Sequence, residues 1–132
     1  MQMGSDVEAG NYQTAIQRAQ TIHLESDYPP NAFSFYHSTL GQAYTGVGDY
    51  AKARQHISRA ISLTIEMNAP AADIATAYAI LAVACKEEWR NTTPPNRTAL
   101  TQAIDNINRA IQCAPSNRDL YEVRDELTAA SK

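Results

Sequence analysis

The sequence predicts an all-α fold built from antiparallel helical hairpins. In the stretch 40–61, Leu40 and Tyr44 are four residues apart and share one face of a helix, after which Gly46 and Gly48 interrupt the chain. A second helix follows, because apolar residues recur there at helical spacing, at Ala53, Ile57, Ala60 and Ile61. The whole chain has only five glycines and few runs of Val and Ile, so nothing in it favours a sheet.

This stretch resembles the tetratricopeptide repeat (TPR). That motif has a Leu-Gly pair and a Tyr on its helix A, a Gly and an aromatic residue at the turn, and spaced Ala residues on its helix B. Small residues stand where the two helices approach closely, and large residues fill the seams around them. The matching positions here are Leu40, Gly41, Tyr44, Gly48, Tyr50, Ala53 and Ala60.

The pattern recurs on both sides of this hairpin. Upstream, residues 10–15 repeat the turn and the start of helix B, and downstream the run 107–111 (INRAI) echoes 57–61 (ISRAI). The resemblance implies three degenerate repeats with lengthened linkers, stacked as a short right-handed TPR-like solenoid with a C-terminal capping helix. In the third helix A, the aromatic, Leu, small and Tyr positions of the family fall on Tyr78, Leu81, Ala82 and Cys85.

We expect a single domain over residues 1–132. It would comprise a partial first helix (1–8), helix B of repeat 1 with a linker (9–31), repeat 2 (32–68), repeat 3 (69–115) with a polar loop at 89–97, and a capping helix (116–130). The first eight residues do not fit a helix A, so either that helix is vestigial or the chain is an excerpt of a longer protein.

The expected helix boundaries follow from the spacing of apolar residues and from residues that cap or break helices. We expect Asp49 to cap the second helix of repeat 2, and Ser116 or Asn117 to cap the last helix. The expected helices span about 12–24, 32–45, 50–67, 70–88, 98–113 and 118–130.

Charge and composition exclude several classes of function. The net charge of −3 and the scattered basic residues give no reason to expect nucleic acid or an anionic membrane as partner. The chain has no apolar run of membrane length and no signal peptide at its start, so we expect a soluble, cytoplasmic protein. Cys85 and Cys113 are too few for a disulfide framework, and we interpret both as thiols on apolar helix faces.

No constellation of catalytic or metal-binding residues stands out. The three histidines, His23, His37 and His56, lack metal-ligand spacing, so we expect no metal, no cofactor and no enzymatic activity. His37 takes the first aromatic position of its helix A and is expected to pack, whereas His56 is expected to face solvent.

The resemblance places a partner-binding surface on helix A of each repeat, because these helices line the concave side of a TPR array. The positions are Phe35, Ser38, Thr39, Gln42 and Thr45 in repeat 2, and Thr76, Ala79, Ile80, Val83, Lys86 and Glu87 in repeat 3. The alternative is that some of them are only exposed, or pack against a neighbouring helix.

Trp89 begins the expected polar loop. It either folds back over the seam between the helices of repeat 3 or serves as an exposed anchor for a partner.

The residue types on these helices restrict the ligand. A clamp for the carboxylates of a peptide C-terminus needs Lys, Asn and Arg, whereas the corresponding positions are Ser38, Gln42, Ala79 and Ile80. We therefore expect an apolar or amphipathic helix as ligand.

Three functional hypotheses of different class remain. The first is a protein–protein interaction module, as a domain of a larger regulatory or scaffold protein. The alternative is a small TPR chaperone or adaptor for a secreted or assembly client, acting as a homodimer. An enzyme or nucleic-acid binder on a helical scaffold is the third, and both the charge and the lack of a site oppose it.

Overall fold

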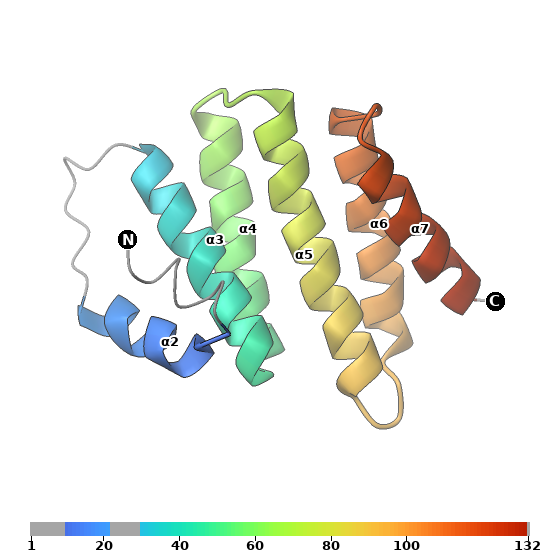
Figure 1. Cartoon of the computed structure of the whole chain (residues 1–132), viewed down its shortest axis with the longest axis horizontal. Coiled ribbons are helices and arrows are strands. Elements are labelled where there is room, and N and C mark those ends of the chain that lie inside the picture. Colours follow the sequence, from blue (N-terminus) through green and yellow to red (C-terminus); the bar gives the residue numbers. More distant parts are fainter. Residues whose placement is uncertain (1–9, 22–29, 132) are drawn as a thin grey trace. The chain divides into compact units, whose positions relative to one another are not determined.

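In the computed structural model, residues 10–21 and 30–131 are described, and they form helices without any strand (Figure 1). This confirms the predicted all-α class for that part of the chain. None of the described helices is long and apolar enough to cross a bilayer. In chain order the helices are α2 (Tyr12–Thr21), α3 (Pro30–Val47), α4 (Tyr50–Glu66), α5 (Ala71–Asn91), α6 (Arg97–Cys113) and α7 (Arg118–Ala130).

The chain divides into two compact units. Unit 1 is Met1–Asn68 and contains α2, α3 and α4, whereas unit 2 is Ala69–Lys132 and contains α5, α6 and α7. The division falls where the sequence places the boundary between repeats 2 and 3. Each unit has one antiparallel hairpin at its centre, α3–α4 or α5–α6, and one further helix packed on it.

Capping residues explain where the helices begin. The Asp49 carboxylate accepts a hydrogen bond from the Lys52 backbone N–H at 3.3 Å, as predicted, and Gly48 makes the preceding turn with φ of +84°. Of the two candidate caps for α7, Asn117 is the one used, with its side chain accepting from the Asp119 N–H at 3.1 Å. In the same way Asn96 caps α6 through the Ala99 N–H at 3.1 Å.

Three helix ends differ from the prediction, and one of them is the end of α3, at Val47 rather than near residue 45. Helix α3 begins at Pro30 rather than near residue 32, because proline is tolerated in the first turn, where its missing N–H has no helical partner. Helix α5 runs on to Asn91, so the loop is shorter than the predicted 89–97 and Trp89 belongs to the last helical turn. The predicted end of the first described helix, near residue 24, and residues 1–8 lie outside the described residues.

In unit 1, the two hairpin helices approach each other closely at Gly41. A Cβ atom placed on Gly41 would lie 2.3 Å from Cγ1 of Ile57, a side chain that is only 1% exposed. The glycine therefore makes room for Ile57. On the other side of α3, the ring of Tyr12 from α2 occupies the space above Gly46, at 2.2 Å from the position of a Cβ there. The Tyr36 hydroxyl also donates to the Ala19 carbonyl at 3.4 Å, which adds a second link to α2.

Unit 2 repeats this hairpin with a different small residue. Ala82 takes the position corresponding to Gly41 and is buried in one cluster with Ile107 from α6. Helix α7 closes the cluster with Leu120 and Leu127. Cys85 is buried in the same cluster, as predicted, while Cys113 is half-buried, and neither forms a disulfide.

The similar sequences of α4 and α6, the second helices of the two hairpins, also have the same pattern of buried residues. Ala53, Ile57 and Ala60 of α4 are buried, and so are their counterparts Ala103, Ile107 and Ala110 of α6. The same local sequence therefore packs the same face in each unit, which is the outcome expected of an internal repeat.

The contact between Gly41 and Ile57 gives a first prediction. Replacing Gly41→Ala should lower the free energy of unfolding by about 1–3 kcal/mol through overpacking, less the gain of about 1 kcal/mol in helix propensity. In an Ile57→Ala background the obstructing atoms are gone, so the same substitution should lose most of its cost. Urea denaturation of the four chains of this double-mutant cycle measures the coupling. An equal cost of Gly41→Ala in both backgrounds would contradict the proposed close approach.

Candidate functional site

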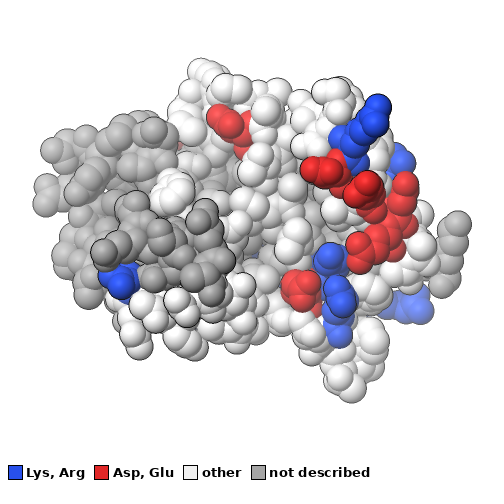
Figure 2. Space-filling view, in the orientation of Figure 1, with Lys and Arg blue, Asp and Glu red and all other residues white. Residues whose placement is uncertain are grey.

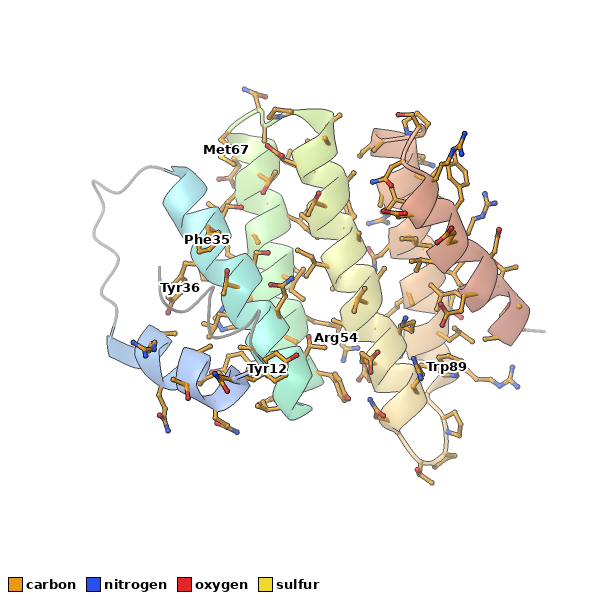
Figure 3. All side chains as sticks on the ribbon, viewed as in Figure 1. Tyr12, Phe35, Tyr36, Arg54, Met67 and Trp89 are labelled. Atoms are coloured by element: carbon orange, nitrogen blue, oxygen red, sulfur yellow. The ribbon has the colours of Figure 1, made fainter. Side chains whose placement is uncertain are left out.

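The surface predicted on α3 is free of charge. Helix α3 contains no Asp, Glu, Lys or Arg over its whole length. Its most prominent exposed side chain is Phe35, which is 46% exposed (Figure 3). Ser38 and Gln42, three and seven residues further on, share the same helix face and are half-buried.

Two of the predicted α3 residues have internal roles. Thr39 is only 4% exposed, so it is a packing residue and offers little surface to a partner. The Thr45 hydroxyl donates to the Gly41 carbonyl at 2.9 Å, one turn earlier in the same helix. The surface that α3 presents is therefore smaller than the five predicted positions, and Phe35 dominates it.

Ser34 and Thr64 join α3 to α4 beside this surface. The Thr64 hydroxyl donates to the Ala60 carbonyl at 2.7 Å and lies 2.9 Å from the Ser34 hydroxyl, which also donates to the Ala60 carbonyl at 3.4 Å. This pair could not be predicted from the sequence, because no motif links a Ser and a Thr that lie on different helices 30 residues apart.

An exposed apolar pair lies next to this link. Phe35 and Ile65 each follow one of the linked residues, and Ile65 is 48% exposed. Because α3 and α4 run in opposite directions, the residues that follow a facing pair project to the same side of the hairpin. Phe35 and Ile65 thus form an apolar pair on one side of unit 1. Ile65 could not be recognised as part of this surface from the sequence, because it occupies a position where the TPR pattern has a closing proline.

On α5, the predicted residues fall into two groups. Thr76, Ile80 and Val83 follow one face, with Thr76 exposed, Ile80 half-buried and Val83 42% exposed. Over residues 71–85 only Asp73 is charged, so this face resembles that of α3 in lacking charge. The half-buried Ala79 lies next to it.

Lys86 and Trp89 belong to the second group. They are turned by about 60° and 120° around the helix from Val83. Lys86 Nζ lies 3.8 Å from the Glu126 carboxylate of α7, and Trp89 is half-buried against the core of unit 2 (Figure 3). Trp89 therefore folds over the seam between α5 and α6, which is the first of its two predicted roles, and is not an exposed anchor. Glu87 is half-buried and pairs with Arg90 at 4.0 Å.

A column of rings connects α3 and α4 further along the hairpin. Nδ1 of His37 and Nδ1 of His56 are 3.0 Å apart, within hydrogen-bonding distance. The Tyr36 ring meets His37 edge-on, and the Tyr44 ring stacks on His56 with centroids 5.5 Å apart. The Lys52 ammonium lies over Tyr44, 5.4 Å from its centroid.

The expectation that His56 faces solvent was wrong. Gln55 before it and Ser58 two residues after it are exposed, but the close approach of α3 places His37 beside His56, and both imidazoles are half-buried. His37 packs as predicted. His23 lies outside the described residues.

The surroundings of both imidazoles disfavour their charged forms. Burial lowers the pKa of His37, and the charges of His56 and Arg59 lower it further. Burial, followed by the charge of Lys52, lowers the pKa of His56. Burial raises the pKa of Tyr36, with Tyr44 adding to the effect.

The described residues contain no group of three or more His, Cys, Asp or Glu side chains that could hold a metal ion. In Figure 2, the charged side chains of unit 2 gather over α7, where Glu122, Asp125 and Glu126 are exposed. The faces on α3 and α5 can therefore bind through apolar and neutral polar contacts, whereas α7 presents a charged surface.

No model of a known protein family and no curated protein matches this chain.

The exposure of Phe35 gives a second prediction, on stability. Because about half of the ring is already in water, Phe35→Ser should lower the free energy of unfolding by no more than about 1 kcal/mol. Leu40→Ala is the matched comparison, since Leu40 is buried on the same helix, and it should cost about 2–5 kcal/mol. Chemical denaturation of the two variants gives both values. A loss at Phe35 as large as that at Leu40 would place Phe35 in the core.

Proposed function

We propose that this chain is a protein–protein interaction module of the TPR type, which binds an apolar or amphipathic helix of a partner protein. The observation that carries the proposal is the apolar pair Phe35 and Ile65 beside a helix without charged residues. Large apolar side chains left half in water on an ordered helix are favourable anchors, because burying them against a partner removes their apolar area from water.

The chemistry of α3 selects among peptide ligands. A charged peptide would lose hydration at this surface without gaining an ion pair, since α3 offers no cation and no anion. An amphipathic helix could place its apolar face on Phe35 and Ile65 and keep its charged face in water. Ser38 and Gln42 can add hydrogen bonds at the edge of the contact.

The α5 face supports the same interpretation in unit 2. Val83 and Ile80 offer aliphatic surface, and Thr76 borders them without a charge. Lys86 and Trp89 are engaged within unit 2, so we leave them out of the proposed contact surface. The residues that we propose to meet a partner helix in unit 1 are Phe35, Ser38, Gln42 and Ile65. In unit 2, taken by itself, the corresponding surface consists of Thr76, Ile80 and Val83.

The third prediction tests this surface. Peptides selected from a displayed library of amphipathic 20-residue helices against the full chain should lose affinity at least tenfold on Phe35→Asp or Ile65→Asp, because each change places a charge in the apolar contact. Ser58→Asp is the matched control, since Ser58 is exposed on α4, and it should leave the affinity within about twofold. Isothermal titration calorimetry provides the dissociation constants. Equal binding by all four proteins would remove the apolar pair from the proposed site.

The dimeric adaptor makes a different prediction for the same residues. If a second copy covers the apolar pair, sedimentation should reveal a concentration-dependent dimer that Phe35→Asp dissociates. A monomer at all concentrations favours the module with an external helical partner.

A further inference from the structure

The histidine pair between α3 and α4 has no counterpart in unit 2. The positions corresponding to His37 and His56 in the second hairpin are Tyr78 and Asn106. There the Tyr78 ring lies under Arg109, 5.9 Å from the guanidinium carbon, and the Asn106 amide donates to the Gln102 carbonyl of its own helix. The two hairpins therefore share their apolar packing but not this polar contact.

We propose that the His37–His56 contact is an acid-sensitive latch, which fastens α3 to α4 when the rings share a hydrogen bond and releases them when both rings are protonated. This inference concerns the stability of unit 1 and does not depend on the proposed partner binding.

The number of hydrogens on the two Nδ1 atoms determines whether the contact is closed or open. With both rings neutral, one Nδ1 carries a hydrogen and donates it to the lone pair of the other across 3.0 Å. With one added proton, a single N–H still lies between the two nitrogens, so the hydrogen bond survives with a positive charge. With two added protons, both Nδ1 atoms carry hydrogens that face each other, and the contact must open.

The neighbouring groups oppose protonation rather than assist it. Lys52 and Arg59 both add positive charge near the rings, and the aromatic neighbours of the pair are Tyr36 and Tyr44. The two described carboxylates on α4 and its cap are far along the helix, with Asp49 about 10 Å before His56 and Glu66 about 15 Å after it. The remaining ionisable groups on the described parts of α2, α3 and α4 are Tyr12, Arg18, Tyr50 and Arg54.

The direction of the pH dependence follows from linkage. The folded chain holds both imidazoles at a pKa below the value of about 6.5 that they have when unfolded, so the unfolded chain binds more protons below that pH. The stabilisation is therefore complete above about pH 6.5 and is lost as the pH falls below it. Carboxylates titrate near pH 4, so the window from pH 7.5 to pH 5 isolates the histidines.

The fourth prediction uses unit 2 as the source of the control. Between pH 7.5 and pH 5, the thermal midpoint of the full chain should fall by about 5 °C, which corresponds to a roughly tenfold loss in the folding equilibrium for a unit of this size. The double variant His37→Tyr/His56→Asn installs the residues that the second hairpin already uses, and its midpoint should change by less than about 2 °C. His23→Gln, the remaining histidine, should keep the full fall. All samples contain a chelator, so that no stray metal ion can bridge the imidazoles.

A second measurement needs no variant. In histidine side-chain ¹H–¹⁵N spectra of the natural chain, the pair should titrate in two separated steps, both below pH 6.5, with the second step accompanied by loss of dispersion in α3 and α4 signals. Two superimposed titrations near pH 6.5 would overturn the proposal, because the rings would then behave as independent and exposed. An acid-induced fall of the midpoint that is equal in the natural chain and the double variant would also overturn it.

Discussion

The close approach of α3 and α4 at Gly41 sets the geometry of unit 1. With no side chain at this point, the branched end of Ile57 rests on the backbone of α3, and a Cβ there would overlap it at 2.3 Å. The approach also brings polar side chains that precede Gly41 on α3 within hydrogen-bonding reach of α4. Ser34 meets Thr64 at 2.9 Å towards one end of the hairpin, and His37 meets His56 at 3.0 Å nearer to Gly41. Both polar links therefore depend on the space that one glycine leaves.

Unit 2 shows how far the same arrangement tolerates change. Its hairpin has Ala82 where unit 1 has Gly41, yet Ile107 is buried as completely as Ile57. The apolar stripe on the second helix of the hairpin is thus the same in α4 and α6, whereas the polar residues beside it differ between the two units. Unit 2 has an aromatic ring under Arg109 and the ion pair between Lys86 and Glu126. Unit 1 has the histidine pair.

The sequence was sufficient to predict those features that depend on local periodicity. It predicted the helical class, a cap at Asp49, a cap at Ser116 or Asn117 and the burial of Cys85, because each is encoded within a few turns of one helix. It was less successful where two helices meet. The burial of His56 and the exposure of Ile65 both depend on which side of α4 faces α3. The periodicity of one helix does not determine how the neighbouring helix is rotated about its own axis. The family pattern assigned Lys86 to the binding surface by its position number, but the contact with Glu126 of α7 is what its side chain makes. For Trp89 the sequence left two interpretations open, and its packing against the core of unit 2 distinguishes them.

The distribution of charge within each unit provides the link from packing to function. A helix with no charged residue over eighteen positions would be poorly hydrated if it were isolated, so it must be covered on several sides. Packing against α2 and α4 covers the faces around Gly46 and Gly41, and Phe35 remains on the side that these helices leave open. On α7, by contrast, the open side carries Glu122, Asp125 and Glu126, as a helix does when it ends a stack and faces water. If the open side of α3 only faced water, a charged side chain at position 35 would be exposed at a lower free-energy cost than a phenylalanine. The exposed Phe35 is therefore the physical reason to look for a partner on this side of α3.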